Sequence, residues 1–158
     1  MRRKDKARNT PEFYTHVLTT ATEVFVAFNS EGVPYVVPLN FAYDDGKLWI
    51  HCACEGRKLE LLARDGRVGF SAVCGVEVLP ETASTRYCSV CGTGQARFVT
   101  DADERQHALR LLTLRYRANC ALPIPEHKVA HTGVICIDIT EISGKQSPAQ
   151  ASIPGERE

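Results

Sequence analysis

The sequence has no excess of charge of either sign and no long apolar run. Nineteen lysine and arginine residues balance nineteen aspartate and glutamate residues, so the formal net charge is zero. A chain that wraps nucleic acid or lies on an anionic membrane is normally more basic, so we expect neither partner. The longest strongly apolar run, from Val24 to Phe28, is far shorter than the roughly 20 residues that a membrane-spanning helix needs.

The basic N-terminus, from Met1 to Arg8, is not followed by the apolar segment of a secretory signal. We therefore expect a cytoplasmic protein whose cysteines are mostly reduced. There are seven cysteines, an odd number, so at least one thiol has no intramolecular partner. The length of 158 residues fits one domain, which we place at residues 10–145, between a basic flexible tail at 1–9 and a polar tail at 146–158.

Turn and capping signals divide this domain into strands and short helices. Thr10 followed by Pro11 is typical of a helix start, and Asp44-Asp45-Gly46 predicts a tight hairpin. Apolar periodicity predicts strands at 23–29, 33–43, 47–53, 68–78, 86–100 and 129–142, and helices at 11–20, 56–64 and 101–117. This order lacks the regular βαβ alternation of a doubly wound sheet. The predicted fold is therefore mainly β (α+β), a six-stranded antiparallel barrel with short peripheral helices.

Two cations stand at the start of the helix at 56–64. Gly56 permits a sharp turn after a strand, and Arg57 and Lys58 follow it in the first helical turn. The free N–H groups and the helix dipole already favour an anion at this position, so added cations are costly unless an anion is bound. A phosphate would satisfy both sets of groups. The alternative is that both side chains are solvated surface cations.

Proline inside the predicted strand at 33–43 indicates an edge strand or a bulge. Pro38 removes one donor from the strand ladder, and interrupted pairing frees backbone groups to bind a planar ligand. Asn40 lies among apolar neighbours and carries both a donor and an acceptor. The alternative is an edge-strand proline beside a surface asparagine.

His51 points to the opposite strand face from Ile50 and Cys52. Its imidazole can act as a general acid or base, can contact a cofactor, or can be purely structural. A zinc site would take its ligands from His51, Cys52, Cys54, Cys88 and Cys91. However, Cys88 and Cys91 fall within one predicted strand, where residues three apart face opposite ways. Most of these cysteines are therefore interpreted as small core residues, and a thioredoxin-type Cys88-x-x-Cys91 motif is disfavoured for the same reason.

Gly92-Thr93-Gly94 matches the first two glycines of a dinucleotide-binding fingerprint. The third glycine and the following helix are missing, so we reject a Rossmann site. The two glycines indicate a bend or a close approach within a barrel strand. Arginines on the third helix are interleaved with acidic residues and indicate a solvated face; they are Arg105, Arg110, Arg115 and Arg117.

A series of motifs runs through the chain in order. It begins with Gly32-Val33-Pro34-Tyr35-Val36-Val37-Pro38-Leu39-Asn40-Phe41, Tyr43-Asp44-Asp45-Gly46, His51 and Glu55-Gly56-Arg57-Lys58-Leu59. It continues with Tyr87-Cys88-Ser89-Val90, Gly94-Gln95-Ala96-Arg97 and Ile142-Ser143-Gly144-Lys145. Together these motifs resemble the pyridoxamine 5′-phosphate oxidase-like FMN-binding split barrels, above all their nitroimidazole-resistance branch. The likeness spans residues 10–145.

The resemblance implies a six-stranded split barrel that binds FMN between the two subunits of a homodimer. It implies that Arg57 and Lys58 hold the flavin phosphate and that Gly56 beside them also belongs to the cofactor-binding residues. The segment Val37, Pro38, Leu39 and Asn40 would run along the flavin ring, with His51, Cys52 and Ala53 beside it. His51 is the candidate catalytic residue. Tyr87 and Ser89 would come from the partner subunit, and no metal is expected.

The resemblance also implies an FMN-dependent oxidoreductase similar to a flavin reductase or nitroreductase. Such an enzyme passes electrons from a nicotinamide nucleotide through FMN to a small acceptor such as a nitroaromatic compound. A fold does not fix a reaction, so two other interpretations stay open. One is a flavin- or haem-binding module without turnover, such as a sensor or carrier. The other is a zinc-binding protein that uses the Cys and His side chains named above.

Overall fold

A computed structural model describes residues 3–116, 124–125, 129 and 131–148 of the chain. Its helices are η1 (Lys4–Lys6), α1 (Pro11–Thr20), α2 (Arg57–Arg64), η2 (Pro80–Thr82) and α3 (Ala102–Tyr116). Its strands are β1 (Glu23–Phe28), β2 (Tyr35–Asn40), β3 (Ala42–Asp44), β4 (Lys47–Cys52), β5 (Arg67–Leu79), β6 (Ser84–Phe98) and β7 (Gly133–Ser147). Within these residues, no helix is long and apolar enough to cross a membrane.

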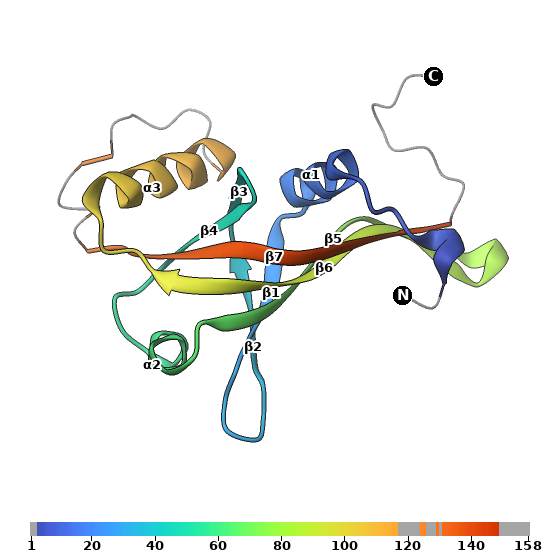
Figure 1. Cartoon of the computed structure of the whole chain (residues 1–158). Helices are drawn as coiled ribbons and strands as arrows, with labels where there is room; N and C mark the ends of the chain where they lie inside the picture. Colours follow the sequence, from blue (N-terminus) through green and yellow to red (C-terminus); the bar gives the residue numbers. More distant parts are fainter. Residues whose placement is uncertain (1–2, 117–123, 126–128, 130, 149–158) are drawn as a thin grey trace.

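The strands form one antiparallel sheet in the order β2-β1-β5-β6-β7-β4-β3. The sheet curls around a core without closing, because β2 and β3 stand at its two edges (Figure 1). Helices surround this curled sheet, which confirms the predicted split barrel. Pro38 lies in the edge strand β2, as a proline inside a strand requires.

The predicted strand at 33–43 is divided in two, so the described part of the chain has seven strands rather than six. β2 ends at Asn40 and pairs with β1, whereas β3 begins at Ala42 and pairs with β4. Phe41 lies between the two ladders with its side chain fully buried. The apolar alternation continues through this break because Phe41 still faces the core, so periodicity did not reveal it.

The last strand begins and ends later than the predicted 129–142. β7 starts at Gly133 and stays paired with β6 as far as Ser147, which lies opposite Tyr87. Gln146 and Ser147 are buried, although the sequence assigned them to the polar tail. Periodicity missed this end because its polar side chains are held by hydrogen bonds rather than by apolar packing; one example is the bond that Arg8 donates to Gln146.

The barrel core comes from alternate residues of each strand and from one face of α1. Among its fully buried side chains are Phe13, Leu18, Val24, Val26, Phe28, Leu48, Ile50, Val90, Ile135 and Ile137. Two glycines of β6 leave room for this core. A Cβ at Gly92 would lie 2.5 Å from the Phe70 ring, and one at Gly94 would lie 2.6 Å from Ile137 Cγ2. The prediction of a close approach at these glycines is confirmed.

Helix α3 covers the outer face of β3, β4 and β7 and forms a second, smaller core with them. Its N-terminus is capped by Asp101, whose carboxylate accepts the Glu104 N–H at 2.8 Å. The Glu104 side chain forms an ion pair with Arg97 of β6. In the sequence, Asp101 and Glu104 have the spacing of a capping box, of which only the Asp101 half is formed.

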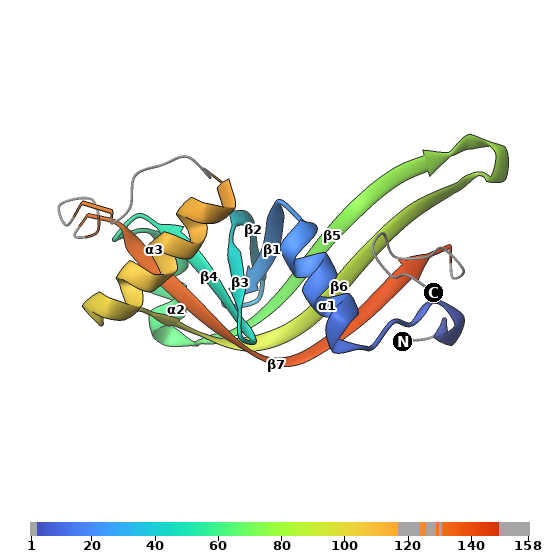
Figure 2. The same ribbon diagram turned by 90° about the horizontal axis from the view of Figure 1, so that it is seen from above.

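The hairpin of β5 and β6 extends past the body of the molecule as a long curved arm (Figure 2). The pairing changes register between Cys74 and Glu77, where Gly75 has a positive φ of 61°. Beyond this bulge Val76 and Val78 are exposed at 62% and 71%. The arm therefore carries apolar side chains that the rest of this protomer does not cover.

Candidate functional site

The start of α2 has the features of an anion site. Gly56 is the N-cap residue and has a φ of 119°, which side chains other than glycine rarely allow. Among the described residues, no side chain caps this helix. The N–H groups of its first turn are therefore not satisfied by a capping side chain, and Arg57 and Lys58 stand directly beside them.

Both cations of this turn contact residues of the predicted site. The Arg57 guanidinium lies over the ring of Tyr35 in β2, 4.9 Å from its centroid. The Lys58 ammonium lies close enough to Cys52 to oppose the burial that raises the pKa of that thiol. Lys58 is half-buried and Arg57 is exposed. The cations therefore connect α2 to both strands that the sequence assigned to the site.

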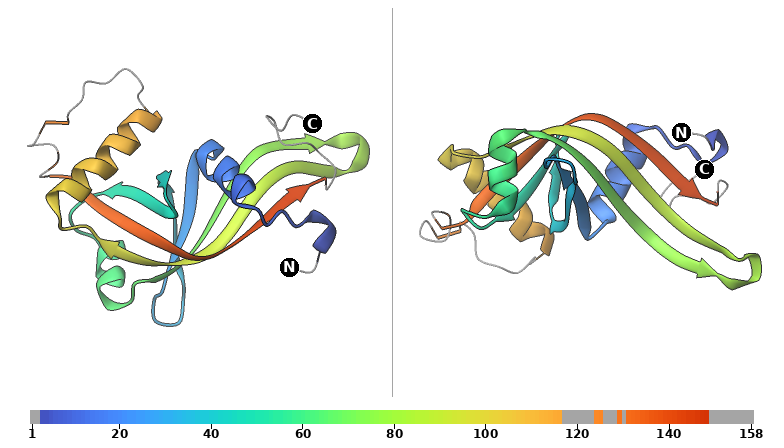
Figure 3. Two further views of the ribbon diagram at one scale, coloured as in Figure 1. Left: turned by 45° about the horizontal axis from the view of Figure 1, so that its top comes forward. Right: turned by 90° about the horizontal axis from the view of Figure 1, so that it is seen from below.

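His51 lies near the end of β4, on the face that α3 covers. Ile50 is buried in the barrel core and Cys52 packs against it, whereas the His51 side chain is exposed. This alternation confirms the predicted orientation. α2 and α3 lie on opposite sides of the sheet at the end where β4 finishes (Figures 1 and 3).

Asn40 and His51 line one pocket although their strands are not neighbours in the sheet. In β2, Val37 and Leu39 pack against the barrel core, whereas Pro38 and Asn40 face outward. The pocket has a volume of about 410 Å³. Its other lining residues are Leu109, Leu112, Thr113, Tyr116, Ile124 and Thr132. Its walls are mostly apolar, and none of these described residues carries a carboxylate, an ammonium or a guanidinium group.

The sequence did not reveal the α3 wall of this pocket. Helical spacing predicts an apolar stripe that contains Leu109 and Leu112, but it does not say which strands the stripe covers. The interpretation of the α3 arginines as solvated is wrong for Arg105 and Arg115. Both are half-buried and donate to backbone carbonyls, Arg105 to Thr132 at 2.9 Å and Arg115 to Ala21. Arg110 is exposed, and Arg117 lies outside the described residues.

The structure does not bring Tyr87 and Ser89 to the other site residues within one protomer. Ser89 pairs with Lys145 of β7, whereas His51 pairs with Val134 of the same strand. The two positions are eleven residues apart along β7, or about 35 Å at ~3.3 Å per residue. Tyr87 and Ser89 stand on the arm and interact there with β7, since the Lys145 ammonium lies 5.4 Å from the centroid of the Tyr87 ring.

The cysteines proposed as zinc ligands lie in two separate parts of the sheet. Cys52 is opposite Gly133, whereas Cys88 is opposite Cys74 in β5. No group of three or more His, Cys, Asp or Glu in the described chain is placed to share a metal ion. Cys88 is half-buried, but Cys54 and Cys91 are exposed, so the core interpretation is wrong for those two. The zinc hypothesis therefore has no support in this arrangement.

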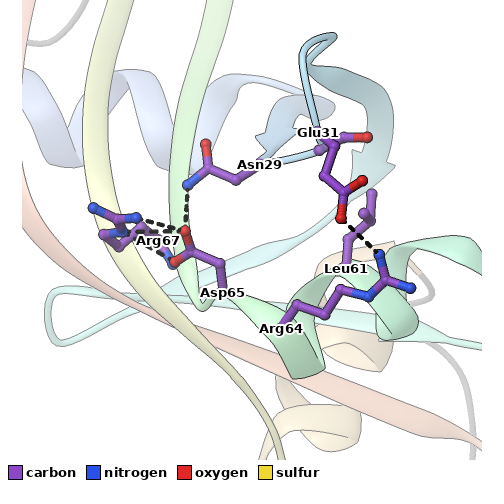
Figure 4. A pocket seen from close by; sticks show the side chains of 7 residues that line it. Asn29, Glu31, Leu61, Arg64, Asp65 and Arg67 are labelled. Atoms are coloured by element: carbon purple, nitrogen blue, oxygen red, sulfur yellow. Dashed lines mark hydrogen bonds and ion pairs between the residues drawn. The ribbon is translucent and has the colours of Figure 1, made fainter.

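A second hollow, of about 520 Å³, lies between the end of α2 and the start of β5 (Figure 4). Its charged groups are already paired. Asp65 accepts hydrogen bonds from Asn29 and Arg67, which hold the pKa of its carboxyl well below the usual range. Across the hollow, Arg64 faces Glu31 at 3.7 Å. With these groups paired and no predicted site residue among its lining, this hollow is not the candidate site.

The curled open sheet places this chain among the split-barrel proteins. A family model described as Pyridoxamine 5′-phosphate oxidase matches residues 11–146. The chain therefore belongs to this family, as its motifs indicated. No curated protein matches the chain as a relative.

Solved structures agree with this family assignment. The chain is similar to a protein of Bacteroides thetaiotaomicron described as a 5-nitroimidazole antibiotic resistance protein, with 26% identity over 89% of this chain and 86% of that chain and a TM-score of 0.78. It is also similar to an FAD-binding protein of Mesorhizobium loti, with 25% identity over 89% and 98% of the two chains and a TM-score of 0.67. An FAD and haem binding protein of Mycobacterium smegmatis shares the fold, with 24% identity over 90% and 74% of the two chains and a TM-score of 0.77.

Proposed function

We propose that this protein is a homodimeric FMN-dependent oxidoreductase that passes electrons from a nicotinamide nucleotide to a small acceptor. The observation that carries the proposal is the first turn of α2. It combines a helix start without a side-chain cap, two adjacent cations and a glycine whose φ excludes most side chains. These are the groups that a phosphate monoester needs, and they follow directly on the strand that carries His51.

Different residues would bind the flavin phosphate and the acceptor in such a site. Arg57 and Lys58 would hold the flavin phosphate, and the Tyr35 ring keeps the Arg57 guanidinium in place by stacking. Flavin, when bound, supplies the two-electron chemistry. Asn40 and His51 bring hydrogen-bonding groups to the pocket, and Leu109 and Leu112 make part of its wall apolar. His51 is the candidate for a proton transfer or a hydrogen bond to the acceptor.

The pocket favours an uncharged acceptor. None of its described lining residues would neutralise a carboxylate or phosphate on the acceptor. Its volume of about 410 Å³ and apolar walls suit a small, flat molecule. The similarity to the 5-nitroimidazole antibiotic resistance protein supports a nitroaromatic acceptor.

The outer face of the sheet supports the homodimer. Val36, Phe25 and Val73 lie diagonally next to one another on β2, β1 and β5, and they are exposed at 54%, 47% and 39%. Such a contiguous apolar patch on a sheet is typical of an interface. In the proposed homodimer, Tyr87 and Ser89 would complete the site of the other copy from the arm that carries them. The distance between these residues and His51 within one protomer would then have a functional reason.

The absorption spectrum of the purified protein tests this proposal. We expect a flavin spectrum, or its appearance when FMN is added to the colourless protein, at one flavin per chain. Anaerobic NADH or NADPH should then bleach it, and a nitroaromatic compound should restore it. Titration with FAD in parallel separates the two flavins. A colourless protein that takes up neither flavin would falsify the proposal.

A flavin carrier without turnover is the second candidate. The similar Mesorhizobium loti protein, at 25% identity, is described by what it binds and not by a reaction. Stoichiometric flavin that neither nicotinamide nucleotide reduces, but that dithionite does, would favour this second candidate over the enzyme.

A further inference from the structure

The last turn of α3 is hydrogen-bonded to Phe41, the residue at the break between β2 and β3. The Tyr116 hydroxyl accepts a hydrogen bond from the Phe41 N–H at 3.2 Å. It also lies 2.6 Å from the Thr22 carbonyl oxygen and 3.1 Å from the Phe41 carbonyl oxygen. A hydroxyl has one proton, which the shorter distance assigns to Thr22. One side-chain oxygen therefore connects α3, the β2–β3 break and the segment between α1 and β1.

Arg115 reinforces the same connection. Its guanidinium lies 4.7 Å above the centroid of the Phe41 ring and donates a hydrogen bond to the Ala21 carbonyl. The Phe41 side chain is fully buried, so its ring is packed between this cation and the barrel core. Tyr116 thus contacts the backbone of Phe41 and Arg115 contacts its ring. Phe41 lies between β2 and β3 and belongs to neither strand.

Asn40 is held on one side by its pairing with Glu23 of β1 and on the other by the contacts made to Phe41. Asn40 is the last residue of β2 and its side chain lines the pocket, and the next residue is Phe41. A residue outside both ladders has no strand partner to fix its backbone, so its N–H needs another acceptor. We propose that Tyr116 is a positioning residue: its hydroxyl holds the β2–β3 break so that Asn40 meets the flavin in the proposed site. This inference rests on the proposed function.

The hydroxyl of Tyr116 is already engaged by backbone groups. Its proton is donated to the Thr22 carbonyl oxygen, and the oxygen accepts the Phe41 N–H. The ring lines the pocket together with Leu112 and Thr113 of the same helix. Replacing Tyr116 by phenylalanine would therefore keep the aromatic ring and remove the hydroxyl's hydrogen bonds to Thr22 and Phe41.

Tyr116→Phe is compared with Tyr14→Phe. Tyr14 is half-buried against the core, whereas Tyr116 is 39% exposed, and the Tyr14 hydroxyl has no hydrogen-bond partner among the described residues. Flavin affinity is measured by fluorescence titration with FMN, and the fine structure of the bound flavin spectrum reports on the surroundings of the ring. We expect Tyr116→Phe to raise the Kd for FMN about tenfold, the scale of one lost hydrogen bond, and to blur that fine structure. Tyr14→Phe should stay within about twofold of the parent protein.

Amide hydrogen exchange tests the connection without flavin. In the apo protein the Phe41 amide should exchange about tenfold faster in Tyr116→Phe and at an unchanged rate in Tyr14→Phe. Unchanged exchange would overturn the inference. So would faster exchange with wild-type FMN affinity and spectrum, because the hydroxyl would then be structural only.

If the parent protein binds no flavin, the proposed function and the positioning role fail together, and hydrogen exchange still shows whether Tyr116 holds the Phe41 amide. Should Tyr116→Phe not fold, Arg115→Gln loosens the same break and gives the same two measurements.

Discussion

The Arg57 guanidinium stacks on the ring of Tyr35, 4.9 Å from its centroid, and so joins the start of α2 to the start of β2. These two elements are separated along the chain by β3 and β4. The contact is electrostatic as well as apolar, because the face of an aromatic ring carries partial negative charge. Because the ring already restricts the Arg57 side chain, this side chain loses little conformational entropy when it binds an anion.

Removing both cations of this turn should abolish FMN binding while the fold persists. Charge-assisted hydrogen bonds contribute about 1.5–3 kcal/mol each, so Arg57→Ala with Lys58→Ala should weaken FMN binding about 100-fold or more. Circular dichroism should not change, because Arg57 is exposed and the helix keeps Leu61 and Leu62 in the core. Arg64→Ala is the control. It removes a cation from the same helix, but at the other end, and should bind FMN normally. Unchanged FMN affinity in the double variant would contradict the phosphate site.

His51→Ala should separate flavin binding from turnover. The side chain is exposed and lines the pocket, whereas Arg57 and Lys58 are not among the residues that line it. We expect FMN affinity to change by less than about threefold and kcat/KM for the acceptor to fall about 10- to 100-fold, the scale of one proton-transfer or hydrogen-bonding group. Steady-state kinetics with a nitroaromatic compound measures this. His16→Ala, on α1, serves as the control. Full activity in His51→Ala would remove this residue from the mechanism.

A charge in the outer apolar patch should split the homodimer. Phe25 is 47% exposed in the protomer, so Phe25→Glu has little effect on the fold but would bury an unpaired carboxylate in an interface. We expect sedimentation analysis to show monomers, with FMN affinity lost in parallel. Leu114→Glu places the same charge at a similarly exposed apolar residue of α3, 45% exposed, and should remain dimeric. A dimeric Phe25→Glu variant would place the interface elsewhere.

The sequence predicted correctly those caps, turns and helix starts that are determined by residues adjacent in the chain. Thr10 caps α1, with its hydroxyl 3.3 Å from the Phe13 amide, as the Thr-Pro start predicted. Asp45 and Gly46 both have a positive φ, as the hairpin between β3 and β4 requires. The start of α2 at Gly56 and Arg57 was also placed correctly. The orientation of His51 followed from strand alternation alone.

Features that depend on distant residues were not predictable in this way. The break at Phe41 exists because β2 and β3 pair with different strands, and Tyr116, 75 residues later, supplies the hydrogen-bond partner. The α3 wall of the pocket depends on which face of the sheet this helix covers. The polar end of β7 was missed because Gln146 is held by Arg8. In each case the interacting residues can be read from the sequence, but the sequence does not show that they lie next to one another in the fold.

The close approach at Gly94 should make this position intolerant of any side chain. A Cβ there would lie 2.6 Å from Ile137 Cγ2 and 2.7 Å from the Asp138 carbonyl oxygen, and the backbone atom cannot move without breaking the ladder. We expect Gly94→Ala to lower the free energy of unfolding by about 1–3 kcal/mol in urea titrations. Gly69→Ala is the matched control, since its nearest neighbour, the Ala27 Cβ, is at an ordinary 3.9 Å. Equal stability of the two variants would contradict this account of β6.

The ion pair between Glu104 and Arg97 should make stability depend on pH in the acid range. The hydrogen bond from Arg97 lowers the pKa of Glu104, so this group stabilises the fold above the pKa of the unfolded chain, about 4.3. The stabilisation is lost as the pH falls from there through the lower pKa of the folded state. Because the two side chains are 44% and 28% exposed, we expect it to reach at most about 1 kcal/mol.

Glu104→Gln measures this contribution directly. At neutral pH the variant should unfold at a lower urea concentration than the parent protein. The two midpoints should converge as the pH falls through the lowered folded-state pKa of Glu104, below which the parent carboxylate is also neutral. Glu81→Gln removes a carboxylate that has no ion-pair partner in the described chain, and its midpoint should follow the parent protein at every pH. If the difference between the two urea midpoints instead stayed constant down to the lowest pH, the substitution would act through packing or hydrogen-bond geometry and not through the lost charge.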